Sequence, residues 1–346
     1  MLVHDLVFQG KSSDVAFRTA SQITYECFQQ QYRNYRNYFH QQGIGPGQNI
    51  GLFSRNSAEY VYCYMALSSL GAVVVPLNFQ LTGREIAYIV KDSEMTHLIS
   101  METLDLDVAV KQLIIADFSA AISEKNLDQA PEYTDINENT PCVIIYTSGT
   151  TGNPKGAILT HGNLVSNVAA FRAALPPTSS ADNILCVLPM YHCFAWTCAV
   201  LYPLSVGASI TILEAFAPKE TFAAIKEKQV TVVFGVPPMY NYLSRIGEAE
   251  DMRSVRVFVS GGAALPQKVA AAFQQKYGRP ILEGYGLSEA SPVVALNPSH
   301  KTKFCSIGRA LPGLSVRVVN SRGETLPPGE VGELIVQGPS VMQGYY

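Results

Sequence analysis

The sequence of 346 residues has little charge and no block of basic residues. Charged residues make up 15% of the chain, against about 25% in an average protein. With 25 Lys and Arg against 28 Asp and Glu, the net charge is −3. The long cationic surface that nucleic acid binding requires is therefore absent, and we expect no nucleic acid partner. The low net charge does not exclude binding of small charged substrates, because a binding site needs only a local electric field.

Long apolar runs are also missing. No stretch reaches the roughly 18–20 apolar residues of a membrane-spanning helix, and the first residues, MLVHD, lack the pattern of a signal peptide. The seven cysteines include no Cys-x-x-Cys pair, which favours small buried thiols in a reducing compartment. The apolar fraction of 47% excludes disorder over most of the chain. We expect a soluble, cytoplasmic protein without a transmembrane segment.

Short apolar runs alternate with helical patterns through most of the chain. This alternation indicates an α/β fold with mainly parallel sheets that helices cover on both faces. The strands are too many for one sheet, so we expect two packed subdomains over residues 1–300. Asn56, three residues before Glu59, predicts the start of one helix. Predicted strands include residues 49–53, 72–77, 96–100, 112–116, 141–146, 183–188, 209–213, 230–234, 255–259 and 280–284, and predicted helices include residues 24–42, 83–91, 218–228 and 266–276.

The pattern changes after about residue 300. Residues 314–320 and 333–337 alternate like half-buried strands, and turn signals lie between them at residues 321–323 and 327–329. We predict that residues 301–346 form the start of a small antiparallel β subdomain, which is incomplete in this sequence.

The densest chemical signal is the segment YTSGTTGNPKG at residues 146–156. It follows the apolar residues 143–145, which predict a buried strand. Glycines let backbone N–H groups converge on an anion, hydroxyls add donors and Lys155 adds a positive charge. The spacing differs from G-x-x-x-x-G-K-[ST], so we predict a phosphate loop other than the P-loop. Its candidate residues are Thr147, Ser148, Gly149, Thr150, Thr151, Gly152 and Lys155.

Two further segments follow predicted strands and offer nucleotide contacts. Gly261 and Gly262 would let a flat ring lie against the backbone at a strand's carboxyl end. Taken alone, the pair is explained at least as well by a tight strand-to-helix turn. In the segment EGYGLSE at residues 283–289, Tyr285 offers a stacking face and Ser288 a hydroxyl for a phosphate oxygen. Glu289 supplies an oxygen ligand of the kind that Mg²⁺ prefers, or is simply a solvated carboxylate.

These segments, in this order, resemble the adenylate-forming superfamily, which includes acyl-CoA synthetases, luciferases and peptide-synthetase adenylation domains. Residues 66–77, 188–196 and 338–346 resemble three further blocks of that family, so the resemblance covers essentially the whole chain. It is most similar to the N-terminal domain of medium- and long-chain fatty acyl-CoA synthetases. The family would next place an aspartate, an arginine, a hinge and a small domain with a catalytic lysine. None of these can be assigned here, so we expect an N-terminal portion with impaired adenylation and no thiol step.

The resemblance implies a role for each candidate residue. His192, Lys155 and Glu289 would be catalytic, and His192 would orient the substrate carboxylate, although a structural role for this histidine is an alternative. Trp196 would gate an acyl tunnel or simply pack in the core. Thr147 and Glu289 would hold Mg²⁺. Nucleotide contacts are implied for the phosphate loop and for Gly261, Gly262, Ala263, Glu283, Gly284, Tyr285, Gly286, Leu287 and Ser288, and acyl contacts for His192, Trp196, Phe234, Gly235, Val236 and Pro237.

The implied reaction uses ATP, Mg²⁺ and coenzyme A (CoA). A carboxylic acid would be activated as acyl-AMP and transferred to the CoA thiol. Residues 234–240 contain no charged side chain that could pair with the ammonium group of an amino acid, which favours a fatty or other apolar acid. An aryl acid, a luciferase-like or peptide-synthetase role, and a catalytically incompetent module that binds nucleotide or acyl groups remain alternatives. The oligomeric state is left open.

Overall fold

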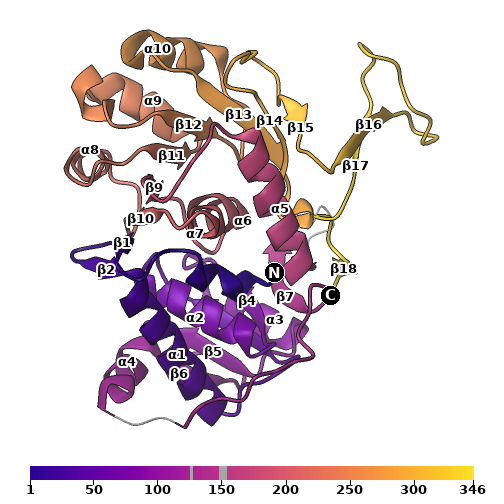
Figure 1. Ribbon diagram of the computed structural model, residues 1–346. Helices are drawn as coiled ribbons and strands as arrows, with labels where there is room; N and C mark the ends of the chain where they lie inside the picture. The colour runs from indigo at the N-terminus through magenta and orange to yellow at the C-terminus, as the bar shows by residue number, and fades with distance from the viewer. Residues whose placement is uncertain (125–127, 148–153) are drawn as a thin grey trace.

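The computed structural model describes residues 1–124, 128–147 and 154–346. In these residues the strands form one sheet of seven strands, one of nine and one of two. Figure 1 shows the seven-stranded sheet in the lower half of the view and most of the nine-stranded sheet in the upper half. The prediction of two packed α/β subdomains is therefore confirmed.

The seven-stranded sheet has the order β18-β8-β7-β4-β3-β5-β6. Strands β3 to β7 pair in parallel, whereas β8 pairs antiparallel with both β7 and β18. Strands β4 and β5 are buried at every residue, which explains their continuous apolar sequence. The strands are β3 (Asn49–Phe53), β4 (Val73–Pro76), β5 (His97–Ser100), β6 (Lys111–Ile114), β7 (Pro141–Thr147), β8 (Lys155–Thr160) and β18 (Gly344–Tyr345), with helices α1 (Tyr25–Gln41), α2 (Ala58–Ser69), α3 (Gly83–Asp92) and α4 (Ile115–Glu124).

The nine-stranded sheet has the order β15-β14-β13-β12-β11-β9-β10-β1-β2. From β1 to β13 its neighbours pair in parallel, and antiparallel strands close both edges. The strands are β1 (Val15–Arg18), β2 (Gln22–Thr24), β9 (Asn183–Cys186), β10 (Ser209–Ile212), β11 (Val232–Gly235), β12 (Val257–Ser260), β13 (Ile281–Gly286), β14 (Val293–Leu296) and β15 (Arg309–Ala310). The helices are α5 (His161–Ala174), α6 (Cys193–Ala195), α7 (Tyr202–Ser205), α8 (Pro218–Glu227), α9 (Pro237–Ile246) and α10 (Gln267–Tyr277), with short helical turns η1 (Val3–Phe8), η2 (Trp196–Leu201), η3 (Ala249–Met252) and η4 (Ser288–Ala290).

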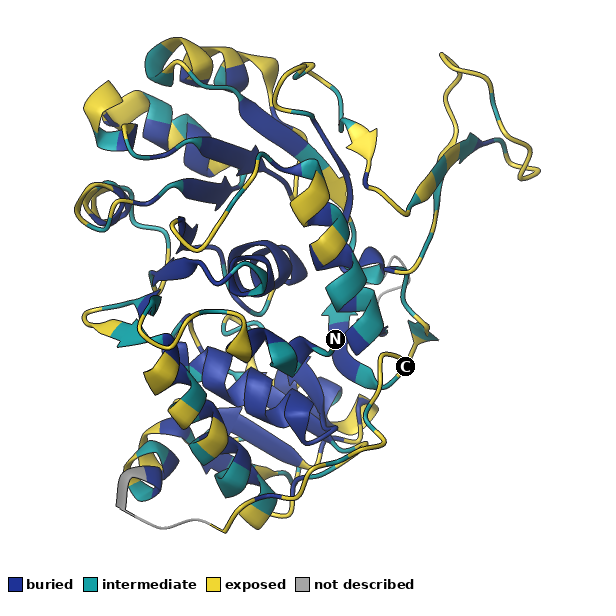
Figure 2. Ribbon diagram, in the orientation of Figure 1, coloured by how far each residue is buried: buried dark blue, intermediate teal, exposed yellow. Residues whose placement is uncertain are grey.

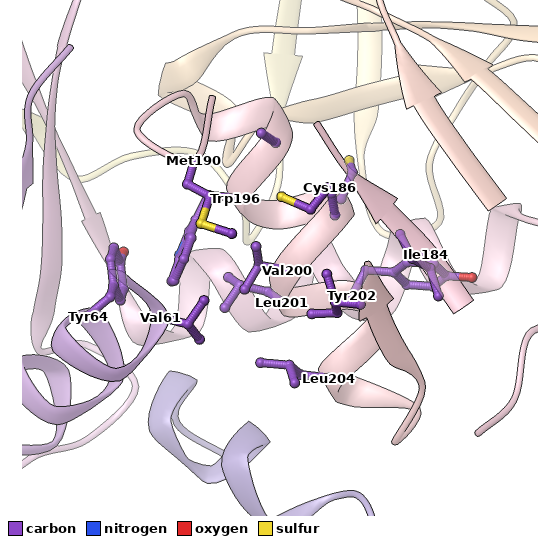
Figure 3. Close-up of a cluster of buried hydrophobic side chains, with 14 of the residues drawn as sticks. Val61, Tyr64, Ile184, Cys186, Met190, Trp196, Val200, Leu201, Tyr202 and Leu204 are labelled. Carbon is purple, nitrogen blue, oxygen red and sulfur yellow. The ribbon is translucent and has the colours of Figure 1, made fainter. Parts of the chain in front are cut away.

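The two large sheets share one hydrophobic core. The continuous helical segment α6–η2–α7 is buried in this core (Figure 2). Figure 3 shows Val61 and Tyr64 of α2 on one side and Met190, Trp196 and Leu204 on the other. The subdomains are thus joined by apolar packing, which fixes the relative position of their strand ends.

Asn56 differs from its sequence prediction. The N-cap of α2 is Ser57, whose hydroxyl accepts a backbone N–H of the first turn, so the prediction that Asn56 begins this helix is wrong by one residue. Asn56 is buried. Its Nδ2 donates to the carbonyls of Leu188 and Leu213, and its Oδ1 accepts from the backbone N–H of Met190 at 2.7 Å. The side chain therefore connects the first sheet to loops of the second.

The last part of the chain contributes to all three sheets. Strands β16 (Ser315–Val319) and β17 (Glu333–Gln337) form the predicted antiparallel pair, and Figure 2 shows it extending from the body of the molecule. By contrast, β15 and β18 join the two large sheets. A subdomain boundary at residue 300 therefore stays a prediction. In the described part of the chain, none of the helices combines the length and hydropathy needed to span a membrane.

Candidate functional site

A cavity of about 160 Å³ lies where the parallel strands of the nine-stranded sheet end. Loops that follow the carboxyl ends of parallel strands converge at one edge of a sheet, which is where α/β proteins bind ligands. Here the loop after β9, the end of β12 and the end of β13 form most of the wall. The described wall residues are Phe171, His192, Cys193, Phe194, Val259, Ser260, Gly261, Gly262, Gly284, Tyr285, Gly286, Leu287, Ser288, Pro292, Val293 and Leu296.

His192 presents a neutral ring to the cavity. It is the N-cap of α6, and its Nδ1 accepts the backbone N–H of Phe194 at 3.2 Å. This bond assigns the proton to Nε2. Although the residue is partly open to solvent, desolvation by the surrounding protein lowers the pKa of His192 below its ordinary value. The side chain therefore offers an Nε2–H donor at neutral pH. No Asp, Glu, Lys or Arg occurs among the described residues of the wall.

The glycine pair after β12 forms a flat part of the wall. A Cβ on Gly261 would lie 3.0 Å from Cζ of Phe194, and one on Gly262 would lie 3.5 Å from Cγ1 of Val236. Gly262 also has a φ of +77°, which side chains other than glycine rarely adopt. Backbone therefore borders the cavity here, as a slot for a planar ring requires. Ala263, the next residue, is exposed.

The glycines of β13 have a different cause. A Cβ on Gly286 would lie 2.2 Å from the carbonyl oxygen of Pro292, and one on Gly284 would lie 3.1 Å from that of Ala295. These positions require glycine because the chain of β14 packs directly against them. Tyr285 between them is 36% exposed, so its ring is available for stacking.

Glu283 and Ser288 hold neighbouring segments in place. Oε1 of the buried Glu283 accepts the backbone N–H of Leu265 at 2.9 Å, which ties down the loop after β12. Glu283 is not among the described wall residues. The hydroxyl of Ser288 lies 3.3 Å from the Sγ of Cys193, so the start of η4 meets the start of α6 beside the cavity.

Thr147 and Lys155 face each other across a β-hairpin. They are partner residues at the end of the β7–β8 ladder, so their side chains share one face. The predicted loop residues Ser148, Gly149, Thr150, Thr151 and Gly152 lie outside the described residues.

Glu289 is held close to this hairpin by the end of the chain. Its backbone oxygen accepts the N–H of Met342 at 2.8 Å, and its Oε1 accepts the hydroxyl of Tyr345 at 2.9 Å. Tyr345 belongs to β18, which pairs with β8. Lys155, Glu289 and Tyr345 therefore come together although they are far apart in sequence.

The described residues suit a metal ion that is bound mostly by a substrate and only partly by protein side chains. They include no group of three or more His, Cys, Asp and Glu side chains that could bind an ion. One carboxylate and one hydroxyl, from Glu289 and Thr147, suit Mg²⁺, which binds through one or two carboxylates together with substrate phosphates.

Five predicted acyl-site residues are not among the described wall residues. Trp196 lies in the core, with its ring centroid 4.0 Å from that of Tyr64 (Figure 3). Phe234 lies behind Phe194, at 6.4 Å between centroids. Val236 lies next to the wall at Gly262, where an added Cβ would come within 3.5 Å of its Cγ1. The other two are Gly235, at the end of β11, and Pro237, at the start of α9.

Sequence reasoning missed several residues at the site. Cys193 and Phe194 lay within the block at residues 188–196 but drew no separate prediction. Phe171 of α5 lines the cavity without any motif. Tyr345 belongs to the block at residues 338–346, and its connection with the site is visible only from its hydrogen bond to Glu289.

The chain matches the AMP-binding enzyme family over residues 7–346. It belongs to this family. The resemblance to adenylate-forming enzymes that the motifs indicated is thereby confirmed, and the solved structures agree with it. ATP-bound MatB from Rhodopseudomonas palustris superposes with a TM-score of 0.90 at 27% identity, covering 100% of this chain and 72% of that one.

Curated relatives of this AMP-binding chain include enzymes named for different acids. Feruloyl-CoA synthase of an Amycolatopsis species is 32% identical over 334 residues, which is 94% of this chain and 66% of that protein. The long-chain-fatty-acid–CoA ligase of Bacillus subtilis (strain 168) is 30% identical over 349 residues, covering 88% of this chain and 62% of that protein. The chain therefore spans slightly less than two thirds of the length of these relatives.

Proposed function

We propose that this chain binds ATP with Mg²⁺ together with a carboxylic acid of apolar body, and that the protein activates the acid as acyl-AMP and transfers it to CoA. The observation that carries the proposal is one cavity that combines a neutral His192, the Gly261–Gly262 backbone and apolar rings. Strand β18 pairs with β8, which begins at Lys155, and Tyr345 of β18 bonds to Glu289. Lys155 and Glu289 are thereby brought close to each other.

In the first half-reaction, a carboxylate oxygen of the acid attacks the α-phosphorus of ATP. The bond from that phosphorus to the pyrophosphate oxygen breaks, and acyl-AMP remains. His192 donates its Nε2–H to the acid and orients it, without transferring a proton. Lys155 and Ser288 add a positive charge and a hydroxyl donor on the phosphate side. Holding both substrates side by side removes much of the entropic part of the barrier.

Glu289 and Thr147 would hold Mg²⁺ together with oxygens of the triphosphate. When bound, the ion neutralises phosphate charge. Glu289 is suited to this task because one carboxylate oxygen, Oε1, is fixed by a hydrogen bond. A fixed carboxylate loses less freedom when it binds an ion than a mobile one does.

The second half-reaction forms the thioester. The CoA thiol loses its proton to water, its sulfur attacks the acyl carbon, the bond from that carbon to the AMP oxygen breaks, and AMP leaves. The support for CoA is that the curated relatives are named CoA synthases and ligases.

A fatty acid is our first candidate for the acid, because apolar rings and no acidic side chain occur among the described wall residues. An amino acid would leave its ammonium group unpaired there. An aryl acid is the second candidate, favoured by the 32% identity to a feruloyl-CoA synthase.

The first test is calorimetric titration of the purified chain with ATP, with and without Mg²⁺, followed by a pyrophosphate-release assay. The acids are octanoate, dodecanoate, ferulate and phenylalanine. We expect Mg²⁺-dependent ATP binding and release with octanoate or dodecanoate above that with phenylalanine. A folded chain that does not bind ATP would refute the proposal, and binding without release would identify a nucleotide-binding module.

A further inference from the structure

Tyr345 contacts both residues that we assign to the phosphate end of the site. Its hydroxyl donates to Oε1 of Glu289 at 2.9 Å. Nζ of Lys155 lies 5.6 Å from the centroid of the same ring, within the range of a cation–π interaction. One aromatic side chain of β18 therefore links a carboxylate of η4 to an ammonium group of β8.

The backbone fixes the place of this ring. Tyr345 is the ladder partner of Ala157 in the antiparallel pair β18–β8. On one side of it, the N–H of Tyr346 donates to the carbonyl of Gly156 at 2.8 Å, and on the other the N–H of Met342 donates to the carbonyl of Glu289 at 2.8 Å. Because the strand is bonded at both ends, the contact with Glu289 does not depend on side-chain packing alone.

The hydrogen bond from Tyr345 makes the two carboxylate oxygens of Glu289 different from each other. A hydroxyl that donates to a carboxylate restrains the one oxygen that accepts it. It engages Oε1, whereas Oε2 makes no hydrogen bond within residues 1–124, 128–147 and 154–346. Oε2 is thus the oxygen left for a cation.

We propose that Tyr345 is a positioning residue for Mg²⁺-dependent nucleotide binding. Its hydroxyl holds the Glu289 carboxylate so that Oε2 is available to the ion, and its ring holds the ammonium group of Lys155 near the same place. The inference rests on the proposed function and assigns to that site a residue outside the metal ligands. Groups that orient a metal ligand through a hydrogen bond change metal affinity by about 10–100-fold when they are removed.

The chain contains a matched control in the next residue. The hydroxyl of Tyr346 accepts from Nδ2 of Asn49 at 3.2 Å, so its hydrogen-bond partner is Asn49 of β3 and not Glu289. Tyr346→Phe therefore removes the same group from the same segment without touching Glu289.

The experiment measures ATP affinity by calorimetry at saturating Mg²⁺ and again in EDTA, for the wild type and for Tyr345→Phe, Tyr346→Phe and Glu289→Gln. We expect Tyr345→Phe to weaken binding about 10-fold with Mg²⁺ and to leave binding in EDTA unchanged. Tyr346→Phe should stay within about twofold of the wild type in both conditions. The control is thermal unfolding of the unliganded variants. A melting temperature equal to that of the wild type would show that each variant keeps the fold.

The double variant Tyr345→Phe, Glu289→Gln tests whether the tyrosine acts through the carboxylate. We expect it to bind no more weakly than Glu289→Gln alone, since coupled residues are not additive. Full additivity, or Mg²⁺-dependent affinity in Tyr345→Phe equal to or tighter than that of the wild type, would overturn the inference. A wild type that does not bind ATP at all would instead refute the proposed function.

Discussion

The ring of Phe194 lies against the backbone of Gly261, so close that a Cβ on Gly261 would come within 3.0 Å of Cζ of Phe194. Phe194 is only 9% exposed, yet it lines the cavity together with Phe171. The ring of Phe234 packs edge-on against it, with 6.4 Å between the centroids. The room beside the glycine pair is therefore set by the side chain of Phe194.

Phe194→Ala should enlarge this part of the cavity. We expect larger acyl groups to gain affinity relative to small ones, and the free energy of unfolding to fall by about 3 kcal/mol because a cavity is created. The measurement is the thermal shift produced by a series of acyl-sulfamoyl adenosines of increasing acyl length. Phe194→Leu, a milder change, should move the optimum in the same direction.

Trp196→Phe is the control for that series. Trp196 lies two residues further along the same helical segment, packed on Tyr64 and Tyr60. From this position we expect an unchanged order of acyl preference. The opposite pattern, with a shift in Trp196→Phe and none in Phe194→Ala, would contradict the role of Phe194 and favour the gating role that the family resemblance implied for the tryptophan.

Asn56→Ala should destabilise the joint between the two sheets. The change leaves the backbone groups of Leu188, Met190 and Leu213 without their partner, and we expect a loss of about 3 kcal/mol in the free energy of unfolding. Urea denaturation measures it. Asn320→Ala, whose amide bonds only within its own turn, should cost less than about 0.5 kcal/mol. A loss in Asn56→Ala as small as that of Asn320→Ala would argue against a structural joint.

How Asn56 was mispredicted shows what local patterns can settle. Both Asn56 and Ser57 are good N-cap residues, and the sequence alone does not rank them. Ser57 becomes the N-cap because the side chain of Asn56 donates to the carbonyls of Leu188 and Leu213, which are more than 130 residues away in the sequence. Strands such as β4, by contrast, were predictable because burial on both faces requires a continuous apolar run.

Strand β8 and Tyr345 were missed for a similar reason. Lys155 and Gly156 look like part of a loop, and only pairing with β7 makes them strand residues. The carboxylate of Glu289 is 56 residues from Tyr345, so no local pattern joins them. The glycine pair at 261–262 does line a cavity, as the position of two glycines directly after a strand suggested, whereas its contact with a nucleotide stays a prediction.

His161 should make the protein less stable as the pH is lowered. It has no exposed surface, and its Nδ1 accepts the backbone N–H of Val3 at 3.1 Å. Burial, and to a lesser extent His4 nearby, lower the pKa of His161 to about 3, against about 6.5 in an unfolded chain. Between these values the unfolded chain binds a proton that the folded one does not, so stability is lost as pH falls through this window.

His161→Gln removes the titrating group and keeps a hydrogen-bond acceptor. The wild type should lose about 2 kcal/mol of unfolding free energy more than this variant between pH 7 and pH 5. Chemical denaturation at the two pH values measures the difference. His300→Gln, at an exposed position, should keep the wild-type slope. Equal slopes in His161→Gln and the wild type would contradict the assignment.

The most direct test of the account is a crystal structure of the chain with dodecanoyl-sulfamoyl adenosine, a stable mimic of the acyl-adenylate. The account predicts density for the adenine against Gly261 and Gly262, for the sulfamoyl group near His192, and for the alkyl chain along Phe194. Density at another face of the molecule, or an alkyl chain directed into solvent with His192 bonded elsewhere, would contradict it.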